Sequence, residues 1–467
     1  MSRALARTHA LFGGLLAVAV ALRVITLLGY PGVAWFGDSG TYLRAALDLK
    51  PSLIRPSGYS VFLFVLRPFH SMIAVTVAQQ LLGLATGVLI YLIVRMKLET
   101  RWAGLIGTLA AAPVLLDAYQ LQLEHLVMAD CLFTFLLVAT VYLVMRGGPM
   151  WAAGAVLAVA ALTRSVGLPF LLIFLVYLLV RRAGLRKIGI FTLAFAVPMI
   201  GYVLWFHADH KTYSLTRTDQ IWLYGRTVDF ADCSVMKPRA ELLPLCPDRI
   251  IREPGEAGAH AAIWGAHAPL RNYPGGVGGV EANKLAGEFA RLAIEKQPLD
   301  YAQVVTRDTW RAFAWSRTDY PDKATVDGYR FPAQAVPLPG GDVAGARQYG
   351  GGSAEPRVVG PFADWARWYQ SWAFVPGTVL GLLLLAGLAG MVRRRRDLGG
   401  PALLPWALGL GLLVVPAGTA DFDYRYVLPA VPLAALATAL AWAPRPEPRA
   451  PESDPAPETE AATPNAA

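Results

Sequence analysis

Residues 11–30 read LFGGLLAVAVALRVITLLGY, and residues 31–38 continue as PGVAWFGD. The first stretch is almost unbroken in apolar character and is long enough to cross the roughly 30 Å hydrocarbon core of a bilayer as a helix. It predicts a span that ends just before Asp38, at the water-facing end of a membrane bundle. Met1–Tyr30 also has a basic start and no small-residue cleavage site, which predicts a retained signal anchor.

Similar apolar segments recur along the chain. Of its 467 residues, 55% are hydrophobic and 16% are charged, which favours an integral membrane protein over a soluble globule. We expect an all-α polytopic membrane protein of about ten transmembrane helices. The long candidates are Leu11–Tyr30, Ser71–Arg95, Leu126–Met145, Lys187–Phe206 and Trp372–Val392, and the shorter ones are Trp102–Leu116, Met150–Leu162, Gly167–Val180, Pro401–Val415 and Tyr426–Ala441.

The distribution of Lys and Arg predicts the orientation, because basic residues favour short cytoplasmic loops. With both termini inside, inner segments hold fourteen basic residues and outer short loops hold six. The six outer residues are Arg44, Lys50, Arg55, Arg67, Arg164 and Arg425. This topology accounts for the formal charge of +9 and argues against nucleic-acid binding. The Ala, Gly and Arg bias is typical of a GC-rich bacterium, so we expect the bacterial plasma membrane.

The chain divides into four predicted parts. Residues 1–206 form an N-terminal transmembrane module with a first outer loop at 31–70, and residues 372–443 form the C-terminal transmembrane helices. Between them, residues 207–371 form a mixed extracytoplasmic loop domain, in which the Gln297-Pro298 step predicts two helices that meet at a turn. Residues 444–467 are rich in Pro, Glu and Ala and predict a disordered cytoplasmic tail.

Cysteine is scarce. Cys131 lies inside a predicted span and is expected to be a small core residue. Cys233 and Cys246 share the outer loop domain, where they either form a disulfide or remain free thiols.

Unusual polar residues gather at the predicted outer face. Asp38 is either the cap of a short surface helix that begins near Gly40, or a catalytic acid. Arg55-Pro-Ser-Gly-Tyr59 follows as a turn with an interfacial arginine or as a phosphate-binding segment. The third outer turn carries Glu124 beside His125, either as a plain polar loop or as a group that holds a cation or a hydroxyl acceptor.

Arg164 and Arg425 sit at the outer ends of two further spans. Together with Arg55 they predict three guanidinium groups on one face, a geometry that suits phosphate oxygens. Asp130 and Arg23 lie within predicted spans, where ionised groups are usually paired or face a polar cavity.

These motifs, taken in order, resemble the glycosyltransferase C superfamily. Its members are polytopic enzymes that take a sugar from a polyprenyl-phosphate carrier, such as protein mannosyltransferases and lipid A aminoarabinose transferases. The matching pieces are Gly37-Asp-Ser-Gly-Thr-Tyr42, Arg55-Pro-Ser-Gly-Tyr59, Glu124-His-Leu-Val-Met-Ala-Asp130, Leu162-Thr-Arg-Ser-Val-Gly167 and Tyr424-Arg-Tyr-Val-Leu-Pro429.

The resemblance implies roles for these positions. Asp38 corresponds to the acid that deprotonates the acceptor or helps hold a metal, and Glu124 is a weaker catalytic candidate. Substrate-binding candidates on the phosphate side are Arg55, Tyr59, Arg164, Tyr424 and Arg425. Some relatives have a second acid where Ser39 stands here, so participation of a divalent cation stays open.

The residues therefore predict a membrane glycosyltransferase that moves a sugar from a polyprenyl-phosphate donor to an extracytoplasmic acceptor. A base is needed for the acceptor hydroxyl, and positive charge is needed near the departing phosphate. The alternatives are a transporter or flippase for a lipid or solute, which predicts polar groups spread through the membrane depth, and a polymerase or ligase of surface polysaccharide that uses the same donor.

Overall fold

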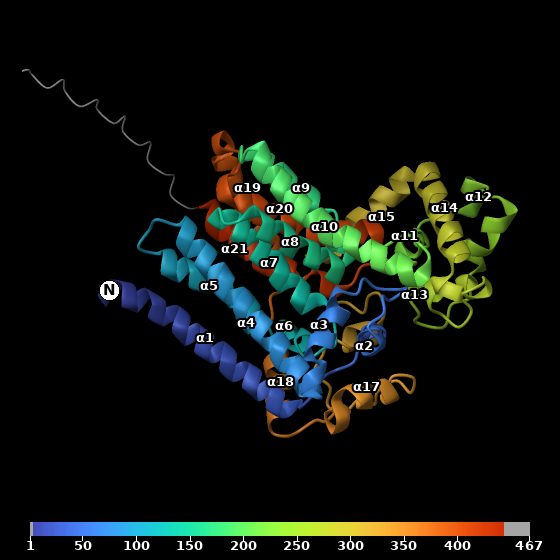
Figure 1. The fold of residues 1–467 in the computed structure, drawn as a ribbon, viewed down its shortest axis with the longest axis horizontal. Helices are drawn as coiled ribbons and strands as arrows, with labels where there is room; N and C mark the ends of the chain where they lie inside the picture. Colours follow the sequence, from blue (N-terminus) through green and yellow to red (C-terminus); the bar gives the residue numbers. More distant parts are fainter. Residues whose placement is uncertain (1–2, 443–467) are drawn as a thin grey trace, which may run out of the picture.

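The protein, a computed structural model that describes residues 3–442, is built from helices and loops (Figure 1). Among the described residues no β-strand forms, and the single isolated bridge joins Ala34 to Leu126. The predicted all-α class is confirmed for this part of the chain. The predicted tail at 444–467 lies outside the described residues.

The first ten α-helices run through the N-terminal half. They are α1 (Arg3–Gly29), α2 (Ser39–Asp48), α3 (Gly58–Leu66), α4 (Met72–Lys97), α5 (Ala103–Leu116), α6 (Ala118–Leu123), α7 (Asp130–Arg146), α8 (Met150–Thr163), α9 (Phe170–Val180) and α10 (Leu185–His210). A 3₁₀ turn, η2 (Ser165–Gly167), joins α8 to α9.

The remaining helices are mostly short and have at most 17 residues each. They are α11 (Asp219–Thr227), α12 (Cys233–Met236), α13 (Gly258–Ile263), α14 (Val280–Lys296), α15 (Pro298–Arg311), α16 (Lys323–Asp327), α17 (Val343–Gly350), α18 (Phe362–Gln370), α19 (Gly377–Arg393), α20 (Leu403–Thr419) and α21 (Ala430–Ala441). The predicted pair of helices that meet at Gln297-Pro298 is confirmed as α14 and α15.

Five helical segments of the described chain are long and apolar enough to cross a membrane: His9–Gly29, Met72–Lys97, Leu185–His210, Gly400–Thr419 and Tyr424–Ala441. Shorter apolar helices of 10–17 residues accompany them, among them α5, α8 and α19. These helices support a multi-pass membrane protein. The total of about ten spans and the inside location of the termini stay predictions.

Local signals in the sequence begin and end these helices. The side chain of Ser71 caps α4 by accepting a hydrogen bond from the Ala74 amide at 3.4 Å. α7 ends at Gly147, whose left-handed backbone, with φ of 69°, costs glycine little. Two helices begin later than their apolar runs. α7 begins at Asp130 because residues 125–127 pair with Ala34, and α19 begins only after Pro376, which has an extended backbone.

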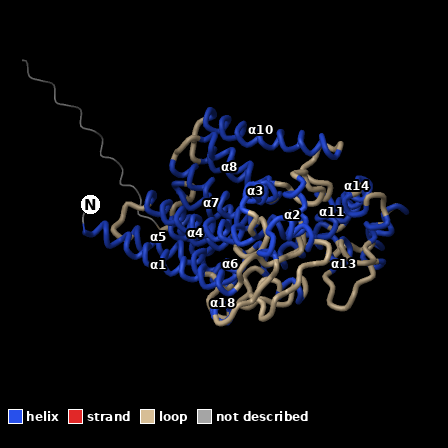
Figure 2. The backbone as a smooth tube through the Cα atoms, turned by 60° about the horizontal axis from the view of Figure 1, so that its bottom comes forward, coloured by secondary structure: helices blue, strands red, loops and turns tan. Residues whose placement is uncertain are grey.

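The helix bundle has one continuous hydrophobic core, with α21 almost wholly inside it. α8 and α10 approach backbone to backbone at Gly154, where an added Cβ would collide with the carbonyl oxygen of Phe191. Figure 2 shows α10 along one edge of the molecule and α11, α13 and α14 together at one end.

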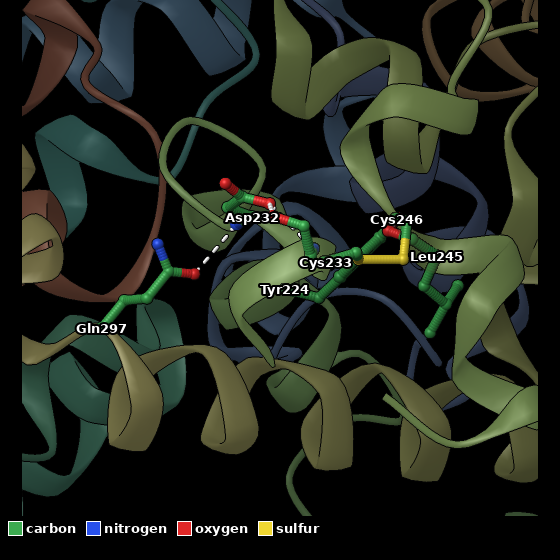
Figure 3. Close-up of a disulfide and its surroundings, with 7 residues drawn as sticks. Tyr224, Asp232, Cys233, Leu245, Cys246 and Gln297 are labelled. Carbon is green, nitrogen blue, oxygen red and sulfur yellow. Dashed lines mark hydrogen bonds between the residues drawn. A yellow bond between two sulfur atoms is a disulfide. The ribbon is translucent and has the colours of Figure 1, made fainter. Parts of the chain in front are cut away.

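Residues 221–293 contribute a second hydrophobic core around Tyr224 and Phe289. Cys233 and Cys246 form a disulfide beside it (Figure 3), so the disulfide is the alternative that the structure contains. The Tyr224 hydroxyl donates to the Leu245 carbonyl at 3.0 Å, next to Cys246. The disulfide and this hydrogen bond tie the α12 segment to the second core.

Candidate functional site: a carboxylate among three guanidinium groups

Asp38 occupies the N-cap position of α2, yet its side chain makes no capping hydrogen bond. Instead, its Oδ1 accepts from Arg55 Nη2 at 2.8 Å and from Arg55 Nε at 3.0 Å. Its Oδ2 accepts from Arg425 Nη1 at 3.2 Å. The carboxylate therefore bridges two guanidinium groups that are 17 and 387 residues away along the chain.

Each of these two arginines is held by groups of its own. The Arg55 guanidinium lies over the Trp222 ring, 4.2 Å from its centroid, so it touches α11 of the loop domain. Arg425 donates from its backbone amide to Asp423 Oδ1 at 3.2 Å and lies 3.1 Å from Asp423 Oδ2 through its Nε atom. These contacts fix the directions from which both arginines reach Asp38.

Arg164 joins the cluster from the break between α8 and η2. It forms an ion pair with Asp130 at the start of α7. Its guanidinium lies 5.0 Å from the centroid of the Tyr426 ring, and that of Arg425 lies 5.2 Å from the same centroid. Both guanidinium groups thus lie near the Tyr426 ring. We call Asp38, Arg55, Arg164 and Arg425 the charged cluster.

Electrostatics keep the Asp38 carboxylate ionised. Burial alone would raise the pKa of Asp38, but the neighbouring charges of Arg55 and Arg425 outweigh burial and lower its pKa below the ordinary 3.8. Counted with Asp130 and Asp423, which pair with Arg164 and Arg425, the cluster has three positive and three negative groups and no net charge. The fork-shaped N–H donors of its three guanidinium groups, rather than an excess of charge, suit an anionic ligand.

Two cavities meet at the charged cluster. The first, with a volume of about 340 Å³, reaches the ends of α8, η2 and α20 and contains Arg164, Pro169 and Pro416 in its wall. We call it the helix-end cavity. The second, about 680 Å³, lies beside the loop domain and is lined in part by Trp264 and Phe36. We call it the domain cavity.

Asp38, Arg55 and Arg425 line both cavities, whereas Arg164 lines only the helix-end cavity. The three predicted guanidinium groups and the predicted acid thus border one shared space. Their arrangement can bind an anion on the helix-end side while a second ligand approaches the same carboxylate from the domain side.

The other predicted site residues lie elsewhere. Tyr59 is fully buried, lines neither cavity and donates its hydroxyl to Gln79 Oε1 at 2.8 Å. Tyr424 is also buried, and its hydroxyl accepts from the Thr318 amide at 2.8 Å. These contacts support the segments that carry Arg55 and Arg425.

Glu124 lies in the bundle interior as the partner of Arg23. Arg23 Nη2 donates to Glu124 Oε1 at 2.7 Å, and both side chains are almost fully buried. Gln120 Nε2 donates to the same oxygen at 3.2 Å. Glu124 lines neither of the two cavities that meet at Asp38. The expectation that charged groups inside the bundle are paired is met by Arg23 with Glu124 and by Asp130 with Arg164.

Sequence reasoning missed a second charged cluster, which includes Asp421 in the loop that carries Arg425. Arg226, from α11, is fully buried and pairs with Asp229 and Asp308. Asp421 lies 3.8 Å from Arg226 and accepts from the Tyr320 hydroxyl at 2.8 Å. Nothing in the sequence marks Arg226, because it stands in a polar segment where most arginines are exposed.

The residues around Asp38 do not form an obvious metal site. Both carboxylate oxygens already accept hydrogen bonds from arginines. Ser39, at the position of a second acid in some relatives, donates its hydroxyl to the Val127 carbonyl at 3.1 Å and is buried. Within residues 3–442, neither group of three or more His, Cys, Asp and Glu side chains close enough to share an ion includes Asp38.

Among known proteins, only solved structures show a similarity to this chain, and that similarity is low. No protein-family model matches the chain, and no curated protein matches it. Among solved structures, the chain is similar to ArnT from Cupriavidus metallidurans bound to undecaprenyl phosphate, with 15% identity and a TM-score of 0.37 over 91% of this chain and 76% of that chain. The apo state of ArnT gives 14% identity and a TM-score of 0.34 over the same shares. Likeness at this level does not establish a shared function.

Proposed function

We propose that this chain is a membrane glycosyltransferase that moves a sugar from a polyprenyl-phosphate carrier to a hydroxyl acceptor on the outer side of the membrane. The observation that carries the proposal is the charged cluster at the junction of two cavities: one carboxylate among three guanidinium groups. The sequence motifs that resemble the glycosyltransferase C superfamily support the same reading.

The donor phosphate occupies the helix-end cavity in this proposal. Arg164 and Arg425 converge there, and a planar guanidinium fork matches two phosphate oxygens at once. Apolar groups such as Leu168 and Val415 line the same cavity at the ends of apolar helices, which suits the lipid end of a carrier. One cavity thus offers both of the chemical surfaces that a lipid phosphate needs.

The acceptor occupies the domain cavity, whose wall includes Trp35, Trp222 and Trp264. Aromatic faces suit the apolar faces of sugar rings as well as other amphipathic acceptors. The Trp35 indole is fixed by donating to Asp342 Oδ2 at 2.9 Å, so this side of the cavity is preorganised. An acceptor hydroxyl that enters from here meets Asp38 opposite the donor.

The chemical step follows from this placement. The acceptor oxygen attacks the anomeric carbon, its proton passes to an Asp38 carboxylate oxygen, and the bond from that carbon to the phosphate oxygen breaks. The bonding electrons stay with the phosphate, whose growing negative charge Arg164 and Arg425 stabilise.

Asp38 is a poor base while both arginines are directed at it, since its pKa is lowered. A bound phosphate shares Arg425 with Asp38 and adds negative charge beside it, so the pKa of Asp38 rises when the donor is present. Proton transfer to Asp38 is thereby favoured in the donor complex.

The test uses proteoliposomes that contain the full chain, envelope extract as acceptor, and a panel of radiolabelled polyprenyl-phosphate hexoses and pentoses. Transfer of label from at least one donor is expected, and Asp38→Asn should lower the rate about 10²- to 10⁴-fold, the usual contribution of a general base. Asp48→Asn, at the exposed end of the same helix, is the matched control.

Full transfer by a correctly inserted Asp38→Asn variant would remove Asp38 from the chemistry. Movement of intact labelled lipid between leaflets, without transfer to any acceptor, would instead identify a flippase.

A further inference from the structure

A third cavity lies at the opposite end of the helices that form the charged cluster. α8 begins at Met150 in this cavity and ends beside Arg164, while α9 begins next to Pro169 in the helix-end cavity and ends beside Arg181. At 1.5 Å per residue, α8 alone separates the two cavities by about 20 Å. The third cavity, of about 320 Å³, is therefore a separate site.

Positive charge dominates this cavity. Four basic side chains line it, namely Lys97, Arg181, Lys187 and Arg394, against one acid, Asp397. Four positive charges less one negative charge leave a net charge of plus three. Arg181 Nη1 pairs with Asp397 Oδ1 at 2.8 Å, and both side chains are at least one-third exposed, so this pair is a solvated rim contact.

The rest of the wall is apolar. Val144, Met145, Met150 and Leu178 lie between the ends of α7, α8 and α9. A cavity that combines basic and apolar side chains at the ends of membrane helices matches a ligand that combines an anionic group with a hydrocarbon part. A small hydrophilic anion would use only the basic side chains.

We propose that this cavity binds the phosphoryl group of an anionic phospholipid in the leaflet opposite the charged cluster. The phosphate lies between the Lys97 and Lys187 side chains, and the first part of an acyl chain follows the Met145 and Met150 surface. The site needs neither the sugar donor nor the acceptor, so it is independent of the proposed glycosyl transfer.

The bound lipid links helix ends that are remote in sequence. Lys97 ends α4, and Lys187 lies in the first turn of α10. The two ammonium groups repel each other, and a phosphate between them reverses that repulsion. Lipid binding is therefore expected to stabilise this end of the bundle.

The experiment compares two double variants of the full-length protein. Lys97→Gln with Lys187→Gln removes two cations that line the cavity. Arg95→Gln with Arg186→Gln removes two cations from the same two segments that do not line it, with the same change in net charge. Delipidated protein in detergent is titrated with phosphatidylglycerol, with phosphatidylcholine and, separately, with inorganic phosphate, and bound ligand is counted by native mass spectrometry.

Wild-type protein and the Arg95→Gln, Arg186→Gln control should retain phosphatidylglycerol in preference to phosphatidylcholine. The cavity variant should bind phosphatidylglycerol roughly 10- to 30-fold more weakly, because each basic group near an anionic headgroup contributes to affinity. Equal losses in both double variants would overturn the proposal, because general surface charge would then explain binding. Tight, lysine-dependent binding of inorganic phosphate without selective lipid binding would also overturn it and assign a soluble phosphate as the ligand.

Discussion

Asp421→Asn is expected to stabilise the protein at neutral pH and to change its pH dependence. Asp421 lies in the loop between α20 and the segment that carries Arg425, and its side chain is 17% exposed. Burial and, after it, the negative charge of Asp229 raise its pKa from 3.8 to about 6, despite the opposing charge of Arg226. The buried cluster therefore holds one carboxylate whose ionisation is unfavourable.

The sign and size of the change in the free energy of unfolding follow from this pKa. A carboxyl group whose pKa is higher in the folded than in the unfolded state binds more protons when folded, so its contribution to stability is present below about pH 4 and is lost as the pH rises through about 6. At about 1.4 kcal/mol per pKa unit, the penalty reaches ~3 kcal/mol at pH 7.5 and ~1.5 kcal/mol at pH 5. Asparagine carries no charge and removes this difference, while its side-chain oxygen can still accept from Tyr320.

The assay is thermal unfolding of the purified protein in detergent, followed by tryptophan fluorescence at pH 5 and pH 7.5. The change in Tm caused by Asp421→Asn should be roughly 2–3 °C more favourable at pH 7.5 than at pH 5. Asp319→Asn, at an exposed position next to Tyr320, the hydrogen-bond partner of Asp421, is the control and should give the same change in Tm at both pH values. An identical effect of Asp421→Asn at the two pH values would refute the reasoning that its carboxyl group titrates in this window.

Three further predictions address the disulfide, the interior ion pair and the donor. Cys233→Ser with Cys246→Ser should lower the free energy of unfolding by about 3 kcal/mol, as expected for a loop of 13 residues, and should abolish any effect of dithiothreitol on denaturant titrations. Glu124→Gln leaves the buried Arg23 charge uncompensated and should cost about 3–5 kcal/mol in the same titrations; an unchanged midpoint would contradict this pairing. Arg164→Lys keeps the charge but loses the planar fork, so the KM for a polyprenyl-phosphate donor should rise roughly tenfold or more in transfer assays, with little change in the KM for the acceptor.

The helical class of the chain follows from local composition. Apolar runs predicted most of the membrane helices because a backbone in hydrocarbon must satisfy its own hydrogen bonds, and a helix does so within one segment. Ends were less predictable. α7 begins at Asp130, four residues after the start of its apolar run at Leu126, because residues 125–127 pair with Ala34. No local sequence pattern contains that contact.

Part of the candidate site was also visible in the sequence. Asp38, Arg55, Arg164 and Arg425 were singled out because charges next to apolar spans are costly and therefore informative. Their convergence on two adjoining cavities was not visible, since Asp38 and Arg425 are 387 residues apart. Glu124 shares the same sequence signal, yet the fold directs it inward to Arg23.

By itself, therefore, the sequence determined the multi-pass helical class and singled out a few ionisable residues next to apolar segments, because hydrophobic periodicity and charge placement act over short distances along the chain. The tertiary structure alone decided which of those charges meet. The pairing of Asp38 with Arg55 and Arg425 depends on how α2, α11 and the loop before α21 pack, and so does the burial of Arg226. Such long-range packing is set by side-chain shape and desolvation across the whole bundle, which a linear pattern does not record.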